Sequence, residues 1–360
     1  MNYYAGLDFG TSGTRIIVID EDLNPVYERA TVYDSEGDRR NPQTWLQALW
    51  DQLGSLPPNI KTNLIKIAMD GTSSTVLICN EDGDPIAPPK MYNDPCNEET
   101  RQRVKDLAPP NHIVQSATSS FAKLLDWQNT GILPKASYLV HQTDWLSAQL
   151  HGDLGKSDFH NSLKLGFNPE TLTYPEFFQP ILNSFIGLLP SPTRPGKEVG
   201  PILSSVASSL DLSPNIIICA GTTDSIAAFL ASEATQTGDA VTSLGSTIAL
   251  KLLSQHRVDE PKFGVYSHWF GQNWLVGGAS NAGGAVLAQF FSPAEIEQLS
   301  SSINWSRPPQ YQYVPLLKKG ERFPNNDPEL EPFFFSSTHK PSRVYERTSS
   351  QSDPGRSSRL

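Results

Sequence analysis

The chain has 360 residues, of which 38% are hydrophobic and 18% charged, and its formal net charge at pH 7 is −10. At about 150 residues per domain this length predicts two domains, and the composition is typical of a globular protein. The acidic excess and the lack of a long basic stripe argue against a nucleic-acid partner, although backbone N–H groups can hold a small phosphorylated ligand.

Cysteine usage and hydropathy indicate a cytoplasmic protein. Cys79, Cys96 and Cys219 are far apart and form no CxxC pair, which predicts three reduced thiols and no zinc site. The first residues lack the basic segment and apolar core of a signal peptide, and no apolar run reaches the ~18 residues of a membrane span. We therefore expect a cytoplasmic location and no membrane partner.

The N-terminal part begins with a predicted antiparallel meander. Apolar runs at 3–8, 14–20 and 25–31 predict three strands, because short links full of turn formers separate them. A helix is predicted over 41–56 from apolar residues at helical spacing. The runs at 64–70 and 74–86 then predict two more strands.

The middle of the chain is predicted to be largely helical over 97–150, with breaks at "APPN" and "GILPK". After a proline-rich stretch at 184–201, a buried strand is predicted over 215–221 and a helix over 223–234. The segment 239–254 then repeats the strand, glycine turn and strand of the chain's opening.

This repeated hairpin supports the prediction of two domains. "LDFGTSGTRIIVID" and "TSLGSTIALKLLS" are two strand pairs with Gly-Thr/Ser turns, and a separation of about 235 residues indicates duplicated domains rather than a short-period solenoid. Two α/β domains that each begin with a meander would place the two turns across a cleft from each other.

The opening turn follows Asp8, which ends an apolar run. Glycines allow close backbone approach, and successive N–H groups in such a turn form an anion-binding nest. A carboxylate beside it suits a metal ion, since hard cations prefer oxygen ligands. The alternative is an ordinary hairpin loop with a glycine bulge. The candidate phosphate-binding residues are Gly10, Thr11, Ser12, Gly13 and Arg15, and the candidate metal ligand is Asp8.

Asp224 stands where a predicted strand gives way through "GTT" to a predicted helix. It is either an N-cap, which is a common role of aspartate at that position, or a general base. In the second case it would take a proton from a substrate hydroxyl that attacks phosphorus. Asp8 would then serve the cation and Asp224 the hydroxyl.

Two later glycine-rich segments are candidates for the nucleotide side. "LGSTIAL" offers a second phosphate clamp, and "WLVGGASNAGGAVLAQFF" ends a predicted strand at a glycine pair before a predicted helix. The glycines of the second segment would allow close approach either by a nucleotide or by a helix packed on a sheet. The candidate residues are Gly245, Ser246, Thr247, Asn281 and Gly283.

Two loops are candidates for sugar recognition. Ser73 lies in "MDGTSST" at a predicted strand-to-strand turn, and Asp94 lies in "MYNDP" ahead of the helical region. A polyol site needs several donors and acceptors in a concave pocket, which suits Asp94, whereas a helix cap or turn aspartate is the alternative. We expect Asp8 and Asp224 to face the substrate as well.

Taken in order, these motifs resemble the FGGY carbohydrate kinases, and within that family the D-ribulose kinases most. The family belongs to the superfamily of hexokinase, Hsp70 and actin. The resemblance runs over residues 3–331, and an ordered set of motifs is more specific than any one of them. It rests on Asp8 with "GTSGTR", then "MDGTSS", "MYND", "HQTDWLSAQLHG", "GTTDS", "LGSTIALK" and "VGGASNAGGAVL".

The resemblance implies an α/β protein of two ribonuclease-H-like domains with a cleft between them. ATP and Mg²⁺ are expected on one side of the cleft and an open-chain ketopentose on the other, with transfer of the γ-phosphoryl group to its terminal hydroxyl. D-ribulose is the first expectation, and D-xylulose or another polyol is the alternative. The family's catalytic base matches Asp224, its first phosphate and metal loop Asp8 and Thr11, its second loop Gly245 to Thr247, and its sugar-facing positions Ser73 and Asp94.

We expect an N-terminal domain at 1–227 with the sugar and metal sites, a C-terminal domain at 228–335 with the nucleotide site, and a tail at 336–360. The tail is rich in serine and arginine and almost without apolar residues, which predicts disorder. Since the family continues past "GERFPNNDPEL" into a segment that closes on adenine, we expect a truncated second domain with impaired adenine binding. The rival hypotheses are an inactive sugar- or nucleotide-binding remnant and an Hsp70- or actin-like ATPase, which would lack "MDGTSS" and "MYND".

Overall fold

The structure, a computed structural model, describes residues 1–178, 187–245, 247–304, 306 and 311–336. These residues form two compact units. The first unit combines Met1–Val241 with Lys251–Pro261 and Tyr266–Val276, and the second contains Thr242–Leu250, Lys262–Val265 and the chain from Gly277 onward.

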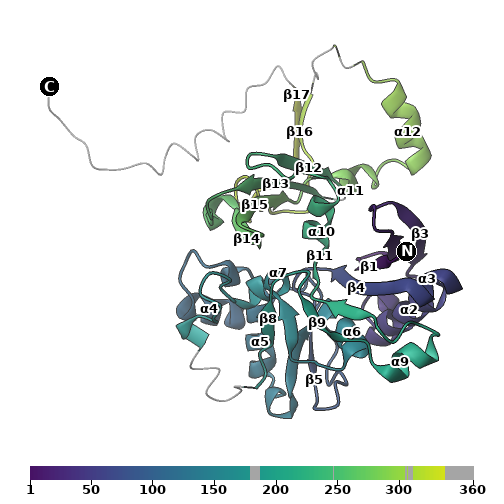
Figure 1. Cartoon of the computed structure of the whole chain (residues 1–360). Coiled ribbons are helices and arrows are strands. Elements are labelled where there is room, and N and C mark those ends of the chain that lie inside the picture. Colours follow the sequence, from purple (N-terminus) through teal and green to yellow (C-terminus); the bar gives the residue numbers. More distant parts are fainter. Residues whose placement is uncertain (179–186, 246, 305, 307–310, 337–360) are drawn as a thin grey trace. The chain divides into compact units, whose positions relative to one another are not determined.

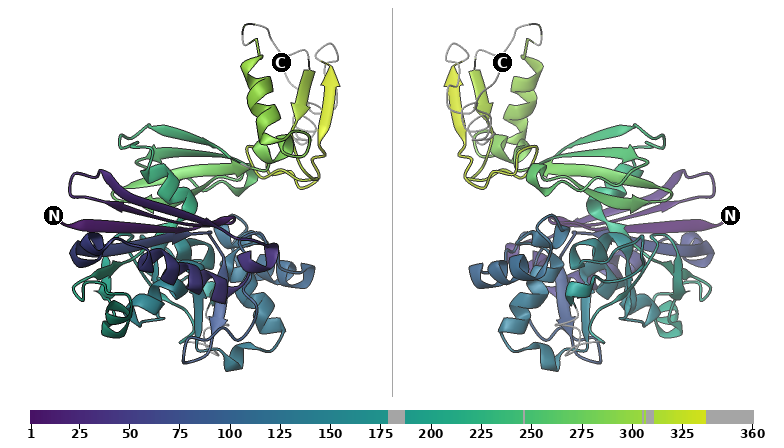
Figure 2. Two further views of the ribbon diagram at one scale, coloured as in Figure 1. Left: turned by 90° about the vertical axis from the view of Figure 1, so that its right-hand side faces the viewer. Right: turned by 90° about the vertical axis from the view of Figure 1, so that its left-hand side faces the viewer.

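A mixed seven-stranded sheet organises the first unit (Figure 1). In order across the sheet the strands are β3 (Pro25–Val32), β2 (Gly13–Ile19), β1 (Tyr3–Phe9), β4 (Leu64–Gly71), β10 (Ile217–Cys219) and β9 (Glu198–Pro201), with β11 (Thr222–Thr223) beside β4. The first three strands form the predicted antiparallel meander and lie side by side in Figure 2. β4 pairs in parallel with β1, β10 and β11, so the carboxyl ends of these strands meet at one edge of the sheet.

Alternation and helical spacing explain the core of this sheet. Leu7 and Phe9 of β1 are buried, as expected for one face of a strand. Trp45 and Leu49 of α2 are fully buried, each contributing ~1.5–3 kcal/mol to stability, and the helix predicted there is confirmed. The helices of this part of the unit are α1 (Glu36–Arg39), α2 (Pro42–Gly54), α3 (Pro58–Asn63), α6 (Gln142–His151) and α9 (Ser204–Ser209).

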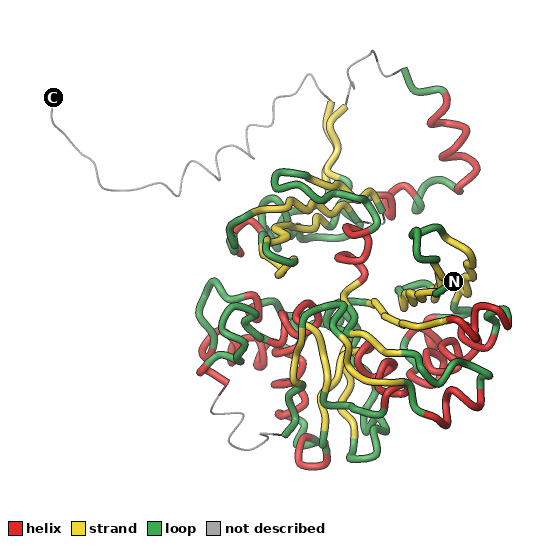
Figure 3. Tube along the Cα trace, viewed as in Figure 1, coloured by secondary structure: helices red, strands yellow, loops and turns green. Residues whose placement is uncertain are grey.

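A short antiparallel pair, β5 (Val76–Cys79) with β6 (Tyr138–His141), lies between two hydrophobic cores. The helical prediction over 97–150 is wrong at β6. Its four residues, "YLVH", are too short a run to distinguish a strand from a helix until the pairing partner is known. The strand predicted over 74–86 is limited to β5. The helices here are α4 (Glu98–Leu107), α5 (Ser120–Asn129) and α7 (Phe159–Ser162), and α4 and α5 are drawn in red in Figure 3. The other elements are β7 (Lys156–Asp158), β8 (Ser191–Thr193) and the 3₁₀ turns Ile113–Gln115, Leu133–Lys135, Leu163–Leu165 and Glu176–Phe178.

A four-stranded sheet contains the second hairpin. Its order is β12 (Ala240–Leu244), β13 (Ile248–Ser254), β15 (Asn273–Ser280) and β14 (Tyr266–Phe270), so the strand pair predicted over 239–254 is confirmed. Two predicted elements are shorter than expected, since β10 covers three residues of 215–221 and the helix over 223–234 ends at Leu230. The remaining elements are α10 (Asp224–Leu230), α11 (Gly284–Leu287), α12 (Pro293–Ser301), the 3₁₀ turn Pro261–Phe263, and the pair β16 (Tyr311–Val314) and β17 (Phe333–Ser336).

Several predictions concern the ends and limits of the chain. Ser336, the first residue of the predicted disordered tail, ends β17, and 337–360 lie outside the described residues. The proline-rich stretch at 184–201 is also described only from residue 187. Within the described ranges no helix is long and apolar enough to cross a bilayer. The domain limits predicted at 227/228 stay a prediction.

Candidate active site

Three carboxylates meet where the parallel strands end. Asp8 of β1 lies directly opposite Asp70 of β4, and Asp70 is in turn opposite Thr222 of β11. Asp224 follows β11 as the first residue of α10. The carboxyl ends of parallel strands are the usual place for a ligand site in α/β sheets. Sequence reasoning found Asp8 and Asp224 but missed Asp70, although "MDG" repeats the "LDFG" pattern of an aspartate at a strand end before glycine.

The electrostatics of this cluster favour a bound cation. Burial first, and then the charges of Asp8 and Asp224, raise the pKa of Asp70 to about 8. Burial also raises the pKa of Asp8, against the lowering effect of a hydrogen bond with Asp70 and of the charge of Arg15. Among the described residues, the buried Oδ1 of Asp8 has no hydrogen-bond partner. Close carboxylates that are hard to ionise together are stabilised when a cation neutralises them.

The donor set fits a divalent cation that keeps other ligands. Within the described ranges, no group of three His, Cys, Asp or Glu side chains could hold a metal ion by itself. Mg²⁺ is usually held by one or two carboxylates together with waters and substrate phosphates. The oxygen atoms of Asp8 and Asp70 therefore fit such an ion without enclosing it.

The opening turn has the geometry of a tight hairpin with exposed hydroxyls. Gly10 N donates to Gly13 O at 3.0 Å, and the side chains of Thr11 and Ser12 are exposed. A Cβ on Gly13 would lie 2.1 Å from Thr31 O, so this glycine is required by the approach of β3. A Cβ on Gly10 would meet no atom closer than 3.5 Å. The hairpin alternative thus explains Gly13, and phosphate binding by the turn stays a prediction.

Arg15 stands on β2 directly opposite Asp8. Its side chain is exposed and lies 3.5 Å from Glu28 in an ion pair. An exposed pair of this kind contributes little to stability. The guanidinium therefore remains accessible to an anion, and its predicted phosphate contact is untested.

Asp224 occupies the first helical position rather than the N-cap. The N-cap residue is Thr223, whose side chain makes no capping hydrogen bond, and Asp224 Oδ1 accepts from Ser225 N at 2.6 Å. Burial raises the pKa of Asp224, which makes its carboxylate a better proton acceptor. A Cβ on Gly221 would lie 2.1 Å from Met69 O, so this glycine lets the loop before Asp224 pack on β4. The position of Asp224 suits a base better than a cap.

The predicted sugar loops are brought together by a buried lysine. Lys123 of α5 is 1% exposed, and its Nζ donates to Ser74 O at 2.7 Å and to Met91 O at 2.6 Å. The first carbonyl belongs to the turn of Ser73 and the second to the loop of Asp94. Burial lowers the pKa of Lys123 to about 7. Sequence reasoning missed this residue, since a lysine in a predicted helix gives no sign of burial.

Asp94 is held by the protein's own cation. Its Oδ1 accepts from Arg40 Nη1 at 3.1 Å and its Oδ2 from Arg40 Nη2 at 2.6 Å, with Met91 N at 2.8 Å from Oδ2. Burial alone would raise the pKa of Asp94, but the hydrogen bonds from Arg40 and Met91 bring it below its ordinary value. Asp94 is thus an ionised turn residue, as the alternative for it predicted, and a sugar contact would have to share it with Arg40.

In the second unit the two glycine-rich segments contact each other. Gly245 N donates to Thr247 O at 3.1 Å, and Gly245 O accepts from Gly284 N at 2.8 Å. Ser246 lies outside the described residues. Gly283 is the N-cap of α11 and has an extended backbone. The predicted nucleotide-side residues therefore share one region, and their role stays a prediction.

Asn281 and a neighbouring glycine are engaged by the protein itself. Asn281 Nδ2 donates to Gly320 O at 2.9 Å, and its backbone N donates to Glu321 Oε1 at 2.6 Å. A Cβ on Gly278 would lie 2.3 Å from the ring of Phe323, so close packing explains that glycine. For this part of the segment, packing accounts for the sequence without a nucleotide.

Comparison with known proteins gives a consistent set of relatives. No family model matches the chain. It is 23% identical to xylulose kinase of Lactococcus lactis over 85% of this chain and 61% of that protein. It is 22% identical to xylulose kinase of Staphylococcus epidermidis over 91% and 70%, and 23% identical to ribulokinase of Halalkalibacterium halodurans over 70% and 53%. The chain thus spans about 61% of the Lactococcus enzyme's length.

Solved structures agree on the fold. Gluconate kinase from Lactobacillus acidophilus superposes with a TM-score of 0.82 at 19% identity, covering 94% of this chain and 73% of that one. A xylulose kinase from Brucella ovis gives 0.81 at 19% identity, covering 96% and 75%. Glycerol kinase of Plasmodium falciparum gives 0.75 at 18% identity, covering 93% and 73%. The expected α/β fold of the ribonuclease-H-like type is therefore confirmed.

Proposed function

We infer that the chain belongs to the FGGY family of carbohydrate kinases, and we propose that it transfers the γ-phosphoryl group of ATP to a hydroxyl of a ketopentose. The observation that carries this proposal is the convergence of Asp8, Asp70 and Asp224 at the carboxyl ends of three neighbouring chain segments. Phosphoryl transfer asks a protein mainly for positioning and charge stabilisation. A carboxylate cluster of this kind offers a cation site and a proton acceptor together.

In the proposed reaction Asp224 is the general base. It accepts the proton of the substrate's terminal hydroxyl as that oxygen forms a bond to the γ-phosphorus and the bond from phosphorus to the ADP oxygen breaks. Burial raises the pKa of Asp224, so the carboxylate holds this proton more readily than an exposed aspartate would. Such a base typically contributes ~10²–10⁴-fold in rate.

Asp8 and Asp70 are the residues proposed to hold Mg²⁺. When bound there, the ion would neutralise the two carboxylates and the charge of the nucleotide phosphates. The buried Oδ1 of Asp8, which has no hydrogen-bond partner within the described part of the chain, supports this assignment. Thr11, Ser12 and Gly10 of the opening turn, and Gly245 to Thr247 of the second turn, are proposed to contact the phosphates.

For the sugar we propose D-ribulose, with D-xylulose or another polyol as the alternative. Lys123 supports a sugar site at the turn of Ser73. Its Nζ connects that turn to the loop of Asp94 by hydrogen bonds to Ser74 O and Met91 O. The relatives named xylulose kinase and ribulokinase support the class of substrate and leave the individual sugar open.

A panel assay tests the substrate class. Purified protein is incubated with ATP and Mg²⁺ and, in turn, D-ribulose, L-ribulose, D-xylulose, glycerol, gluconate or no sugar, and ADP is measured. We expect sugar-dependent ADP formation that is greatest with D-ribulose. ADP formation that is equal with and without sugar would instead identify an ATPase, and no ADP formation with any sugar would contradict the kinase proposal.

A further inference from the structure

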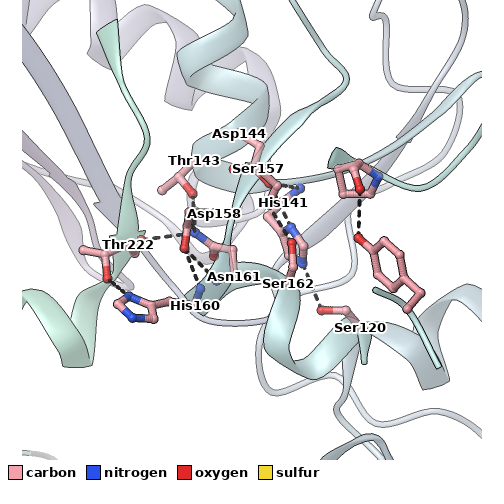
Figure 4. Close-up of polar contacts among 12 residues, drawn as sticks. Ser120, His141, Thr143, Asp144, Ser157, Asp158, His160, Asn161, Ser162 and Thr222 are labelled. Carbon is pink, nitrogen blue, oxygen red and sulfur yellow. Dashed lines mark hydrogen bonds and ion pairs between the residues drawn. The ribbon is translucent and has the colours of Figure 1, made fainter. Parts of the chain in front are cut away.

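Thr222, two residues before Asp224, is held at both of its polar groups by the short segment α7. Its hydroxyl lies 2.7 Å from Nδ1 of His160, and its carbonyl accepts from Nδ2 of Asn161 at 3.2 Å (Figure 4). His160 and Asn161 are both buried. Two side chains of α7 thus hydrogen-bond to β11, the strand that leads directly to Asp224.

The hydrogen bonds of His160 have one consistent direction. Its Nε2 lies 2.5 Å from the carbonyl oxygen of Trp269, which can only accept, so Nε2 carries the proton. Burial lowers the pKa of His160 to about 4, and the ring is neutral at physiological pH. Nδ1 must then accept, and the hydroxyl of Thr222 must donate to it. The pair is therefore directional and specifies a hydroxyl at position 222.

His160 and Asn161 are themselves held in place by hydrogen bonds to Asp158. This carboxylate is fully buried, and its Oδ1 accepts from the backbone N of His160 at 2.8 Å and of Asn161 at 3.0 Å. Its Oδ2 accepts from Asn161 Nδ2 at 2.6 Å. Asn161 Nδ2 also lies 3.1 Å from Thr143 Oγ1, on α6. These bonds restrict the side chains of His160 and Asn161, so the two residues can hold Thr222 in a fixed position.

The strand that His160 and Asn161 hold, β11, lies beside Asp70 of the proposed site. Thr222 pairs with Asp70 across β11 and β4, and the chain then passes through Thr223 to Asp224. Thr223 is fully buried, and among the described residues its hydroxyl has no hydrogen-bond partner. The Thr223 side chain therefore supplies no polar anchor for Asp224, although the residue pairs with Gly71 of β4, and the nearest side-chain anchor on β11 is the Thr222 hydroxyl.

We propose that His160 is a positioning residue that acts through the hydroxyl of Thr222 to set the direction of the Asp224 carboxylate. This inference rests on the proposed function, in which Asp224 is the base. A small displacement of a catalytic group can reduce a rate by roughly 100-fold. A purely structural role would instead stabilise the fold without changing how Asp224 titrates.

The charged groups that face Asp224 come from four elements besides its own. They are Asp8 of β1, Asp70 of β4, Lys164 of the 3₁₀ turn Leu163–Leu165, and Lys251 of β13. Burial is the largest effect on the pKa of Asp224 and raises it, the charge of Asp8 raises it as well, and the hydrogen bond from Ser225 N and the two lysines lower it. If the hydrogen bond between Thr222 and His160 is lost, we expect the Asp224 carboxylate to become more solvated. Its pKa should then fall toward the ordinary value, because burial is the main reason that it is raised.

The test compares Thr222→Val, which keeps the shape and removes the hydroxyl, with Thr222→Ser, which keeps the hydroxyl. Asp224 is observed directly by titrating the ¹³C signals of labelled aspartate carboxyls, with Asp224→Asn used to assign its signal. Thr62→Val is the matched control, because that exposed threonine also loses one hydroxyl bond, to Pro58 O at 2.9 Å. His160→Phe provides a second way to remove the bond if Thr222→Val does not fold.

We expect Thr222→Val and His160→Phe to lower the pKa of Asp224 by about half a unit or more, with Thr222→Ser and Thr62→Val unchanged. In the kinase assay, kcat should fall roughly 10- to 100-fold in the first two variants while the KM for sugar stays within about twofold. An unchanged Asp224 titration in folded Thr222→Val would overturn the inference even if the chain proved not to be a kinase. If the wild type is an active kinase, an unchanged kcat in Thr222→Val would overturn the inference as well. If instead the proposed function is wrong, the wild type itself will show no turnover, and the titration of Asp224 still tests the inference.

Discussion

Asp8 and Asp70 occupy facing positions on two parallel strands, an arrangement that like charges do not favour. Because the folded pKa of Asp70 is raised, to about 8, its contribution to stability is complete below the ordinary value of 3.8 and is lost as the pH rises through the interval up to about 8. The cluster therefore costs stability at neutral and alkaline pH in the absence of a cation. Such a cost is common where a site is built for a ligand rather than for the fold.

Replacing Asp70 by Asn should remove this cost. We expect Asp70→Asn to raise the melting temperature by roughly 2–4 °C at pH 8 without Mg²⁺, corresponding to about 1 kcal/mol, and to have little effect at pH 4. The measurement is a series of thermal unfolding curves against pH. Asp82→Asn, in an exposed turn, is the control. Wild-type and Asp70→Asn curves that stay parallel from pH 4 to pH 8 would disprove the raised pKa.

Which site residues could be predicted depended on how local their signal is. Asp8 and Asp224 stand in turns whose glycines and hydroxyl residues can be recognised from the sequence. Asp70 was missed although "MDG" offers a similar local signal. Lys123 and His160 could not be predicted, because their roles come from contacts with residues far along the chain. The approach of β3 requires Gly13, and its predicted phosphate contact stays a prediction.

Among the elements, α5 has a role that its sequence alone does not indicate. Its Lys123 donates to carbonyls in two separate turns, those that contain Ser73 and Asp94, and both turns are predicted to face the sugar. A methionine at this position would keep much of the volume but leave Ser74 O without its donor, which costs ~1–3 kcal/mol for a buried group. Met91 O would lose one of two donors and keep Asp94 N at 3.0 Å.

We therefore expect Lys123→Met to raise the KM for sugar about tenfold or more, with a smaller change in kcat, because the turns lose their common support. Steady-state kinetics with the best sugar of the panel measures this split. Lys105→Met, an exposed lysine of α4, should behave as the wild type. A KM for sugar that is the same in Lys123→Met and Lys105→Met would show that these turns do not form the sugar site.

The elements that could be predicted were those with a strong local pattern. The opening meander and the second hairpin have short glycine-containing turns between apolar runs, and both are confirmed. β6 was assigned to a helix because its strand character comes from pairing with β5, which lies far away in the sequence. Propensity is a weak guide where tertiary pairing decides the backbone.

For the whole molecule, the order of motifs proved more informative than any one motif. Each turn taken alone was compatible with an ordinary hairpin or helix cap. The structure corrects one of these interpretations, since the N-cap of α10 is Thr223 and not Asp224. The full set pointed to the FGGY carbohydrate kinases, and that fold is confirmed by structures at TM-scores of 0.82 and 0.81. The carboxylates belong to the first unit, and the predicted nucleotide-side glycines belong to the second.

The central claim is that Asp224 is the base in a sugar-dependent phosphoryl transfer, and one comparison of rates tests it most directly. Sugar-dependent ADP formation is measured for the wild type, Asp224→Asn and Asp211→Asn, the last an exposed aspartate of the same unit in a left-handed turn that asparagine tolerates. We predict that Asp224→Asn lowers kcat by ~10²–10⁴-fold with an unchanged melting temperature, whereas Asp211→Asn matches the wild type. A kcat in Asp224→Asn within about threefold of the wild type would contradict the account, since a general base typically contributes far more than that.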